Sequence, residues 1–77
     1  MNVVYNSQHY YLVEYPLRGG FELVDKESGR GAFIQGSVAA QFRQSLQEAV
    51  DINPDVEAID EFLGEFDEWL DQPVVYH

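Results

Sequence analysis

Lys and Arg are scarce in this chain, and the segment from Gln44 to His77 has neither. The whole sequence has 4 Lys and Arg against 14 Asp and Glu, for a formal net charge of -10. In residues 1–43 the acids and bases balance, so the net charge belongs to the later segment. Binding to single-stranded nucleic acid requires a positive groove, which this composition does not provide, so no direct nucleic-acid binding is expected. The acids of the later segment are Glu48, Asp51, Asp55, Glu57, Asp60, Glu61, Glu65, Asp67, Glu68 and Asp71.

Cysteine is absent, and so are long hydrophobic runs. The first absence excludes disulfides, thiol catalysis and Cys-ligated zinc, and it fits a reducing compartment, so a cytoplasmic location is expected. No uncharged stretch approaches the ~20 residues that cross a bilayer, and the start at Met1 lacks the pattern of an export signal. Neither membrane insertion nor export is expected.

Aromatic residues, by contrast, are plentiful for so acidic a chain. Five Phe, five Tyr and one Trp accompany a hydrophobic content of 45% in 77 residues. Disordered acidic chains are poor in aromatics, so this composition indicates a folded protein. A chain of this length forms one small core, and we expect a single domain over residues 1–77.

The first part of the chain has the pattern of short strands. β-branched and aromatic residues gather at 3–5, 10–15, 21–24 and 31–34, separated by polar or glycine-containing turns. Pro16 ends the second of these segments, and Gly29 is expected to adopt a positive φ in a hairpin loop. The pattern predicts an antiparallel sheet of three to four strands within residues 2–35.

The second part has helical periodicity. Ser37 is a suitable N-cap for a helix over about 37–50, and Asn53 is a suitable N-cap for a second helix over about 54–71, with Pro54 at its first position. The apolar positions of both helices define one stripe each, so we predict an α+β fold with two antiparallel helices packed on one face of the sheet. The predicted helical core consists of Phe42, Leu46, Ile59, Phe62, Phe66 and Trp69.

The acidic face of the second helix is the first candidate site. Pairs such as Glu57 and Glu61 place like charges four residues apart, which costs roughly 0.2 to 0.5 kcal/mol per pair. This face either keeps the protein soluble or docks a basic protein partner. The candidate binding residues are Glu57, Asp60, Glu61, Asp67, Glu68 and Asp71.

The tyrosines of the predicted sheet are the second candidate site. Tyr is favoured at protein interfaces, and a small sheet covered by helices on one side leaves its other face open. That face is a candidate homodimer surface, and the alternative is that these tyrosines are ordinary half-buried strand residues. The cluster consists of Tyr5, Tyr10, Tyr11 and Tyr15.

Catalytic and metal-binding patterns are weak throughout. Neither His9 nor His77 is paired by any motif with a nucleophile, and exposed helix acids lack the desolvation that raises a carboxyl pKa for acid/base work. The acids lack the calcium-loop pattern, and the glycines form no phosphate-binding motif. We therefore expect no catalytic residue, no metal and no cofactor.

Five segments resemble a family of short beta-proteobacterial proteins classed as a domain of unknown function. The resemblance implies a bacterial cytoplasmic protein with no assigned activity, and it implies no site residue. It also favours an ordered role for the apolar ending over a frayed tail. The segments are Val4-Tyr5-Asn6-Ser7, Glu22-Leu23-Val24-Asp25-Lys26, Phe33-Ile34-Gln35-Gly36, Asp60-Glu61-Phe62-Leu63-Gly64 and Pro73-Val74-Val75-Tyr76-His77.

The function that these observations favour is a small non-enzymatic protein-interaction module that presents its acidic helix to a basic protein. One alternative is a mimic of nucleic-acid charge that occupies a DNA-binding protein, which needs carboxylates spaced like phosphates along a convex face. The other is a small enzyme that uses carboxylates, which needs a concave pocket holding a perturbed carboxylate or His9.

Overall fold

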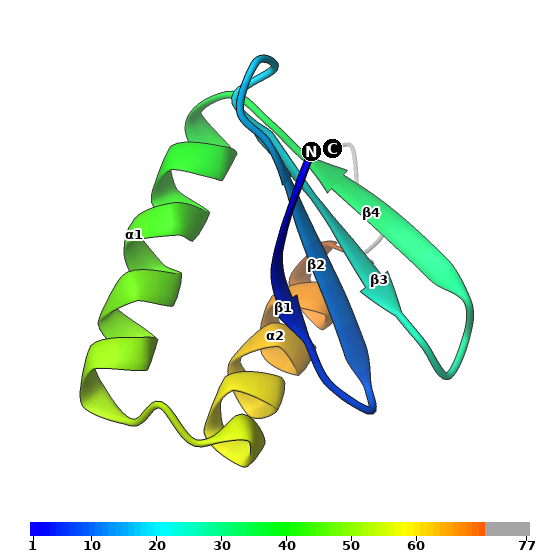
Figure 1. Cartoon of the computed structure of the whole chain (residues 1–77), viewed down its shortest axis with the longest axis vertical. Helices are drawn as coiled ribbons and strands as arrows, with labels where there is room; N and C mark the ends of the chain where they lie inside the picture. Colours follow the sequence, from blue (N-terminus) through cyan, green and yellow to red (C-terminus); the bar gives the residue numbers. More distant parts are fainter. Residues whose placement is uncertain (71–77) are drawn as a thin grey trace, which may run out of the picture.

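The computed structural model describes residues 1–70, which form four strands followed by two helices (Figure 1). The strands lie within the predicted residues 2–35, and the α+β class is confirmed. The candidate residue Asp71 and the apolar segment 73–77 lie outside the described residues. The elements are β1 (Asn2–Asn6), β2 (Tyr10–Tyr15), β3 (Gly20–Asp25), β4 (Arg30–Ile34), α1 (Ser37–Ile52) and α2 (Val56–Leu70).

The sheet is an antiparallel meander with the strand order β1-β2-β3-β4. Each strand pairs with its neighbour in sequence, so every connection is a short hairpin loop. Gly19 and Gly29 have φ values of 63° and 74°, which only glycine adopts without strain. The prediction for Gly29 is therefore confirmed.

An irregularity in the pairing of β1 with β2 changes which way its side chains point. Val3 lies opposite Val13, but Tyr5 lies opposite Leu12, so the register shifts at the residue between them. Side chains alternate between the faces of a sheet, and one extra residue reverses the alternation. Tyr5 consequently lies on the same face as Leu12, and Val3 lies on the opposite face.

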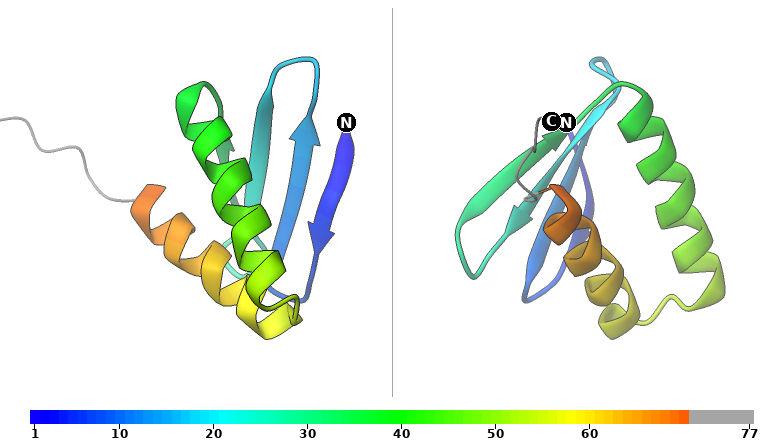
Figure 2. Two further views of the ribbon diagram at one scale, coloured as in Figure 1. Left: turned by 90° about the vertical axis from the view of Figure 1, so that its left-hand side faces the viewer. Right: turned by 180° about the vertical axis from the view of Figure 1, so that it is seen from behind.

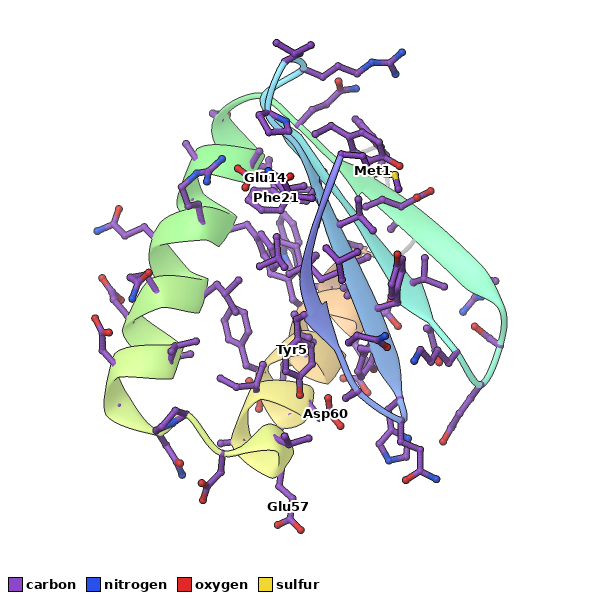
Figure 3. All side chains as sticks on the ribbon, in the orientation of Figure 1. Met1, Tyr5, Glu14, Phe21, Glu57 and Asp60 are labelled. Atoms are coloured by element: carbon purple, nitrogen blue, oxygen red, sulfur yellow. The ribbon has the colours of Figure 1, made fainter. Side chains whose placement is uncertain are left out.

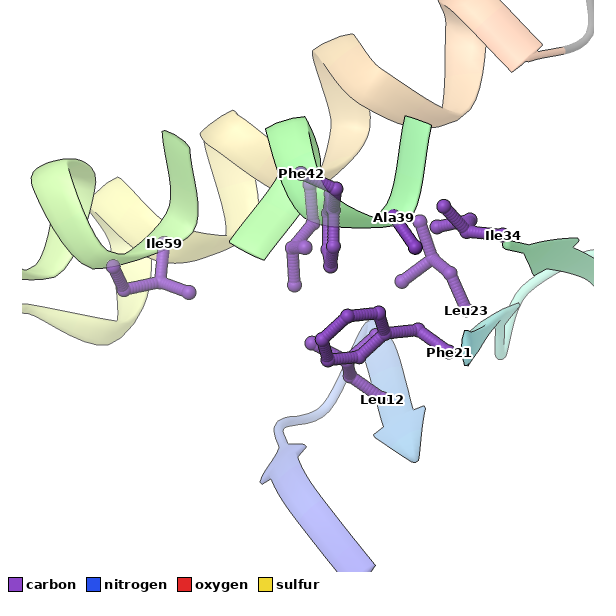
Figure 4. Close-up of a cluster of buried hydrophobic side chains, with 8 residues drawn as sticks. Leu12, Phe21, Leu23, Ile34, Ala39, Phe42 and Ile59 are labelled. Carbon is purple, nitrogen blue, oxygen red and sulfur yellow. The ribbon is translucent and has the colours of Figure 1, made fainter. Parts of the chain in front are cut away.

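Both helices cover the same face of the sheet (Figure 2). They run in opposite senses and splay apart from the connection between them (Figure 1). Residues of both layers meet in one apolar cluster, in which Leu12 and Phe42 are 0% exposed (Figure 4). The cluster consists of Leu12, Phe21, Leu23, Ile34, Ala39, Phe42, Ile59 and Leu63.

The start of α1 differs from the prediction. Gly36, rather than Ser37, is the N-cap, with φ 71° and no side-chain capping bond. Its carbonyl accepts hydrogen bonds from the N–H groups of Ala39 and Ala40. The chain turns sharply here from the sheet layer to the helix layer, and glycine takes the cap because it tolerates the positive φ that the turn needs.

The connection between the helices also differs from the prediction. Asn53 is the C-cap of α1, since its N–H donates to the Ala49 carbonyl at 3.0 Å and its φ is -154°. Its side-chain Oδ1 also accepts a hydrogen bond from the Asp55 N–H at 3.1 Å, which is the part of the predicted N-cap role that the structure retains. Pro54 explains this conformation, because a residue before proline is held in extended geometry. The first helical hydrogen bond of α2 runs from Ile59 N–H to the Asp55 carbonyl, so α2 begins two residues later than predicted.

The predicted helical core is confirmed for Phe42 and Ile59, which are buried. Leu46, Phe62 and Phe66 are partly buried against the same cluster. The prediction for Trp69 is wrong, because its side chain is 54% exposed. The splay of the two helices explains the difference: at this end of α2, the Trp69 ring contacts Phe66 beside an apolar groove instead of being enclosed.

Candidate functional site: an acidic cleft at the start of α2

A cleft of about 500 Å³ lies between the turns of the sheet and the first turns of α2. Five of its lining residues are acids, and none is Lys or Arg. The sheet contributes Asp25, Glu27 and the β1–β2 turn, whereas α2 contributes the other three acids. The lining consists of Gln8, His9, Tyr10, Asp25, Glu27, Val56, Glu57, Asp60 and Glu61.

Asp60 is the best-anchored acid of the cleft. Its Oδ1 accepts hydrogen bonds from the Tyr5 hydroxyl at 2.8 Å and from Ser7 Oγ at 2.7 Å. Figure 3 shows Tyr5 and Asp60 side by side, whereas Glu57 points away from the body of the protein. The Tyr5 hydroxyl also lies 3.1 Å from the carbonyl oxygen of Val56. These contacts connect β1 to the first turn of α2 and hold one carboxylate in a defined position.

Ser7 also stabilises the turn between β1 and β2, in which it lies. Its Oγ accepts hydrogen bonds from the backbone N–H groups of His9 and Tyr10, at 3.2 and 3.1 Å. Short side chains that bond to nearby backbone groups favour such turns. Lys26 then ties the turn to the neighbouring hairpin, because its Nζ donates to the Ser7 carbonyl and to Asn6 Oδ1.

Tyr10 forms the wall of the cleft nearest to the middle of α2. Its hydroxyl approaches the helix backbone at Gly64, where an added Cβ would lie 3.2 Å from the hydroxyl oxygen. Glycine inside a helix costs about 1 kcal/mol relative to alanine. The close approach of Tyr10 accounts for a glycine at this position.

The His and the Ser of this region each contact an acid of the cleft. His9 Nδ1 lies 3.3 Å from Glu27 Oε1, while Ser7 Oγ is bonded to Asp60. In a catalytic triad one His bonds both to a carboxylate and to the Ser hydroxyl, whereas here the Ser7 hydroxyl donates to Asp60 and His9 contacts Glu27. Within residues 1–70, no group of three or more His or acidic side chains is arranged to hold a metal ion.

The structure divides the acids that the sequence analysis selected. Glu57, Asp60 and Glu61 come together at the cleft, whereas Asp67 and Glu68 lie farther along α2 and do not line it. Asp25 and Glu27 also line the cleft but were not among the predicted site residues. Their place in a hairpin loop was visible in the sequence, but nothing there indicated that this loop packs near the start of α2.

The predicted tyrosine cluster is also divided between two faces. Tyr5 and Tyr10 lie on the helix-covered face and pack against the core. Tyr11 and Tyr15 alternate with Leu12 and therefore lie on the open face. The prediction of one tyrosine-rich face is wrong, because the register shift in β1 and the alternation in β2 send the four rings to opposite sides.

The phenols on the helix side have pKa values above the usual 10.0. Burial is the main cause for both, because it disfavours the charged phenolate. The hydrogen bond to Asp60 raises the pKa of Tyr5 further, and the bond with Ser7 lowers it. For Tyr10, the negative charges of Asp67, Asp25 and Asp60 raise the pKa after burial.

These shifts predict a loss of stability in alkali. A phenol whose pKa is higher in the folded state contributes stability that is fully present below pH 10.0 and is lost as the pH rises through the folded-state value. We expect the free energy of unfolding to fall more steeply above this pH for the parent protein than for the Tyr5→Phe/Tyr10→Phe variant. Urea denaturation across an alkaline pH series measures both slopes, and equal slopes would contradict the assignment.

The chain is thus an α+β protein with a four-stranded meander, two splayed helices and an acidic cleft between the turns of the sheet and α2. No solved structure matches this chain. Over residues 1–77 the chain matches the family described as protein of unknown function (DUF3567), and it belongs to that family. It is also similar to the protein BTH_I0359 of Burkholderia thailandensis, with 41% identity over 85 aligned residues that cover both chains completely. The resemblance seen in the sequence is thereby confirmed.

Among the described residues, neither helix has the length and apolar character that crossing a bilayer requires.

Proposed function

We propose that this protein is a non-enzymatic interaction module whose acidic cleft receives a basic segment of a partner protein. The observation that carries the proposal is the cleft itself, in which five acids from the sheet and from α2 surround one hollow. Potentials add in a concave site of one sign, so the cleft attracts a cationic side chain more strongly than dispersed acids would. The net charge of -10 adds long-range attraction to the same partners.

The way in which the cleft is built also supports binding. Asp60 is held by two hydroxyl donors, so less side-chain freedom is lost when a cation binds to it. Glu57 and Glu61 are exposed on the neighbouring turns and are free to approach an extended ligand. The acids at the start of α2 also lie near the positive end of the helix dipole, which stabilises them in the free protein.

A matched pair of variants tests the proposal. Glu57→Gln/Glu61→Gln removes two charges at the cleft, and Glu65→Gln/Glu68→Gln removes two charges from exposed positions of α2 outside it. We expect the first to weaken binding of a short arginine- and lysine-rich peptide about tenfold, and the second to change it less than about twofold. Isothermal titration calorimetry measures both, with a neutral peptide of equal length as the control.

The alternatives give different results in the same experiment. A mimic of nucleic-acid charge needs a convex row of carboxylates, so the two variants would weaken binding equally. A face that only solubilises the protein would bind the basic peptide no better than the neutral one. For the proposed cleft, raising the salt from about 0.1 M to about 1 M should abolish most of the binding, because the Debye length falls from about 10 Å to about 3 Å.

A further inference from the structure

The face of the sheet opposite the helices is not covered by any other element of residues 1–70 (Figure 2). Its most exposed large apolar side chains lie on the two edge strands, β1 and β4, whereas Val13 on the inner strand β2 is 2% exposed. Val3 is 54% exposed, and Phe33 is 42% exposed. The Phe33 ring packs beside Tyr15, with the ring centroids 5.7 Å apart, so this part of the face is a continuous aromatic surface. The apolar residues of the face are Val3, Tyr11, Val13, Tyr15, Val24 and Phe33.

This open face is almost free of charge, although the protein is strongly acidic. By the alternation of the strands, Glu22 is the acid that shares it. The Glu22 carboxylate accepts a hydrogen bond from the Tyr15 hydroxyl at 3.3 Å, so it is partly satisfied within its own chain. The acidic cleft lies instead between the sheet turns and α2, in the layer that holds the helices.

This distribution of charge favours a second copy of the chain as the occupant. A basic partner would find its complement at the cleft and not on a neutral apolar face. Two copies of a chain with net charge -10 repel each other, and the repulsion is smallest when their most acidic layers point in opposite directions. Contact through the open faces places both helix layers on the outside and so meets this condition.

We propose that two copies associate through their open sheet faces in a symmetric homodimer. A two-fold axis brings the same face of each copy together, and the two sheets pack about 10 Å apart as in a sandwich. Each Phe33 and Val3 is then removed from water. The assembly has four layers, with helices outside and the two sheets inside.

The size of the face limits the strength of this dimer. Four strands about 4.8 Å apart and about five residues long, at about 3.3 Å per residue, give a flat area of roughly 300 Å². Stable interfaces bury about 800 Å² on each partner, so we expect weak association, with a dissociation constant on the order of 0.1 mM.

Sedimentation equilibrium of the full chain, from about 10 µM to about 1 mM, tests the proposal. We expect a monomer–dimer equilibrium that strengthens about tenfold when the salt is raised from about 0.1 M to about 1 M, because salt screens the repulsion between the copies. Binding of a basic segment at the cleft should respond to salt in the opposite direction. Failure of one proposal is therefore distinguishable from failure of the other.

Variants that add one negative charge locate the interface. Val3→Glu and Phe33→Glu place the charge on the open face, and Ile52→Glu places it at a position that is 84% exposed at the end of α1. We expect Val3→Glu and Phe33→Glu to weaken the dimer at least about tenfold and Ile52→Glu to weaken it less than about twofold. Circular dichroism checks that each variant is folded. If Phe33→Glu is unfolded, Val3→Glu alone tests the position of the interface.

Two results would overturn the proposal. A monomer at every concentration and salt would do so, and the cover of the open face would then have to be sought in residues 71–77 or in another protein. A dimer that Ile52→Glu weakens as much as Val3→Glu would place the interface elsewhere.

Discussion

Replacing Phe42 by alanine is expected to destabilise this protein by about 3 to 5 kcal/mol. Phe42 is 0% exposed and lies where α1 meets both the sheet and α2. Its ring centroid is 5.1 Å from that of Phe21, 6.0 Å from that of Phe62 and 4.7 Å from that of Phe66. Because rings from both the sheet and α2 pack against the Phe42 ring, its removal leaves a large cavity, so the cost should lie at the upper end of this range.

The measurement is urea denaturation followed by circular dichroism. A domain of this length has roughly 4 to 11 kcal/mol of stability, so Phe42→Ala should leave a protein that is close to unfolding at room temperature. Trp69→Ala is the matched control, because it also removes a ring from a helix, but one that is 54% exposed. We expect it to cost about 1 kcal/mol. Equal losses for the two variants would contradict the arrangement of the core.

Replacing Asp60 by alanine is expected to cost about 2 to 4 kcal/mol, which is a large effect for an acid that is only partly buried. Both the Tyr5 and the Ser7 hydroxyls donate to its Oδ1, and hydrogen bonds to a charged group are worth about 1.5 to 3 kcal/mol each. The loss leaves two part-buried hydroxyls without this acceptor and loosens β1 from α2. Urea denaturation again gives the free energy of unfolding.

A double-mutant cycle separates this network from the general effect of removing a charge. Tyr5→Phe removes one donor, and Asp60→Ala combined with Tyr5→Phe should cost less than the sum of the two single changes. Glu57→Ala is the control, since Glu57 is an exposed acid on the same turn of α2, and we expect it to cost less than about 0.5 kcal/mol. Additive losses for Asp60 and Tyr5 would show that the hydrogen bond contributes nothing to stability.

Most of the fold could be predicted from local patterns. The four strands and two helices follow from the spacing of apolar residues and from the glycines and prolines between them. Most of the errors occur where tertiary structure decides, and one, at Asn53, follows from the neighbouring proline. Gly36 replaces Ser37 as the N-cap because the chain must turn between layers, and Asn53 ends α1 because Pro54 holds it extended. Trp69 follows the apolar stripe of α2, but the splay of the helices leaves it exposed.

The candidate site could be predicted only in part. The sequence places Glu57, Asp60 and Glu61 on one side of a helix, since residues three and four apart are neighbours there. It does not show that Asp25 and Glu27 join them, because that proximity depends on how a hairpin packs against a helix about thirty residues later. It also does not distinguish Asp60, which is anchored by two hydroxyls, from the other acids.

What the sequence determines by itself is what depends on composition and on neighbours along the chain: the acidity, the absence of thiol chemistry, the α+β class and the approximate ends of the elements. What only the tertiary structure decides is which residues meet. The register shift between Val3 and Tyr5 is the clearest case. It turns Tyr5 toward Asp60 and leaves Val3 on the open face, so it helps to form both surfaces for which a function is proposed. Local sequence does not reveal such a shift, because Tyr5 pairs with β2 and contacts Asp60 of α2, and no short window of sequence contains both partners.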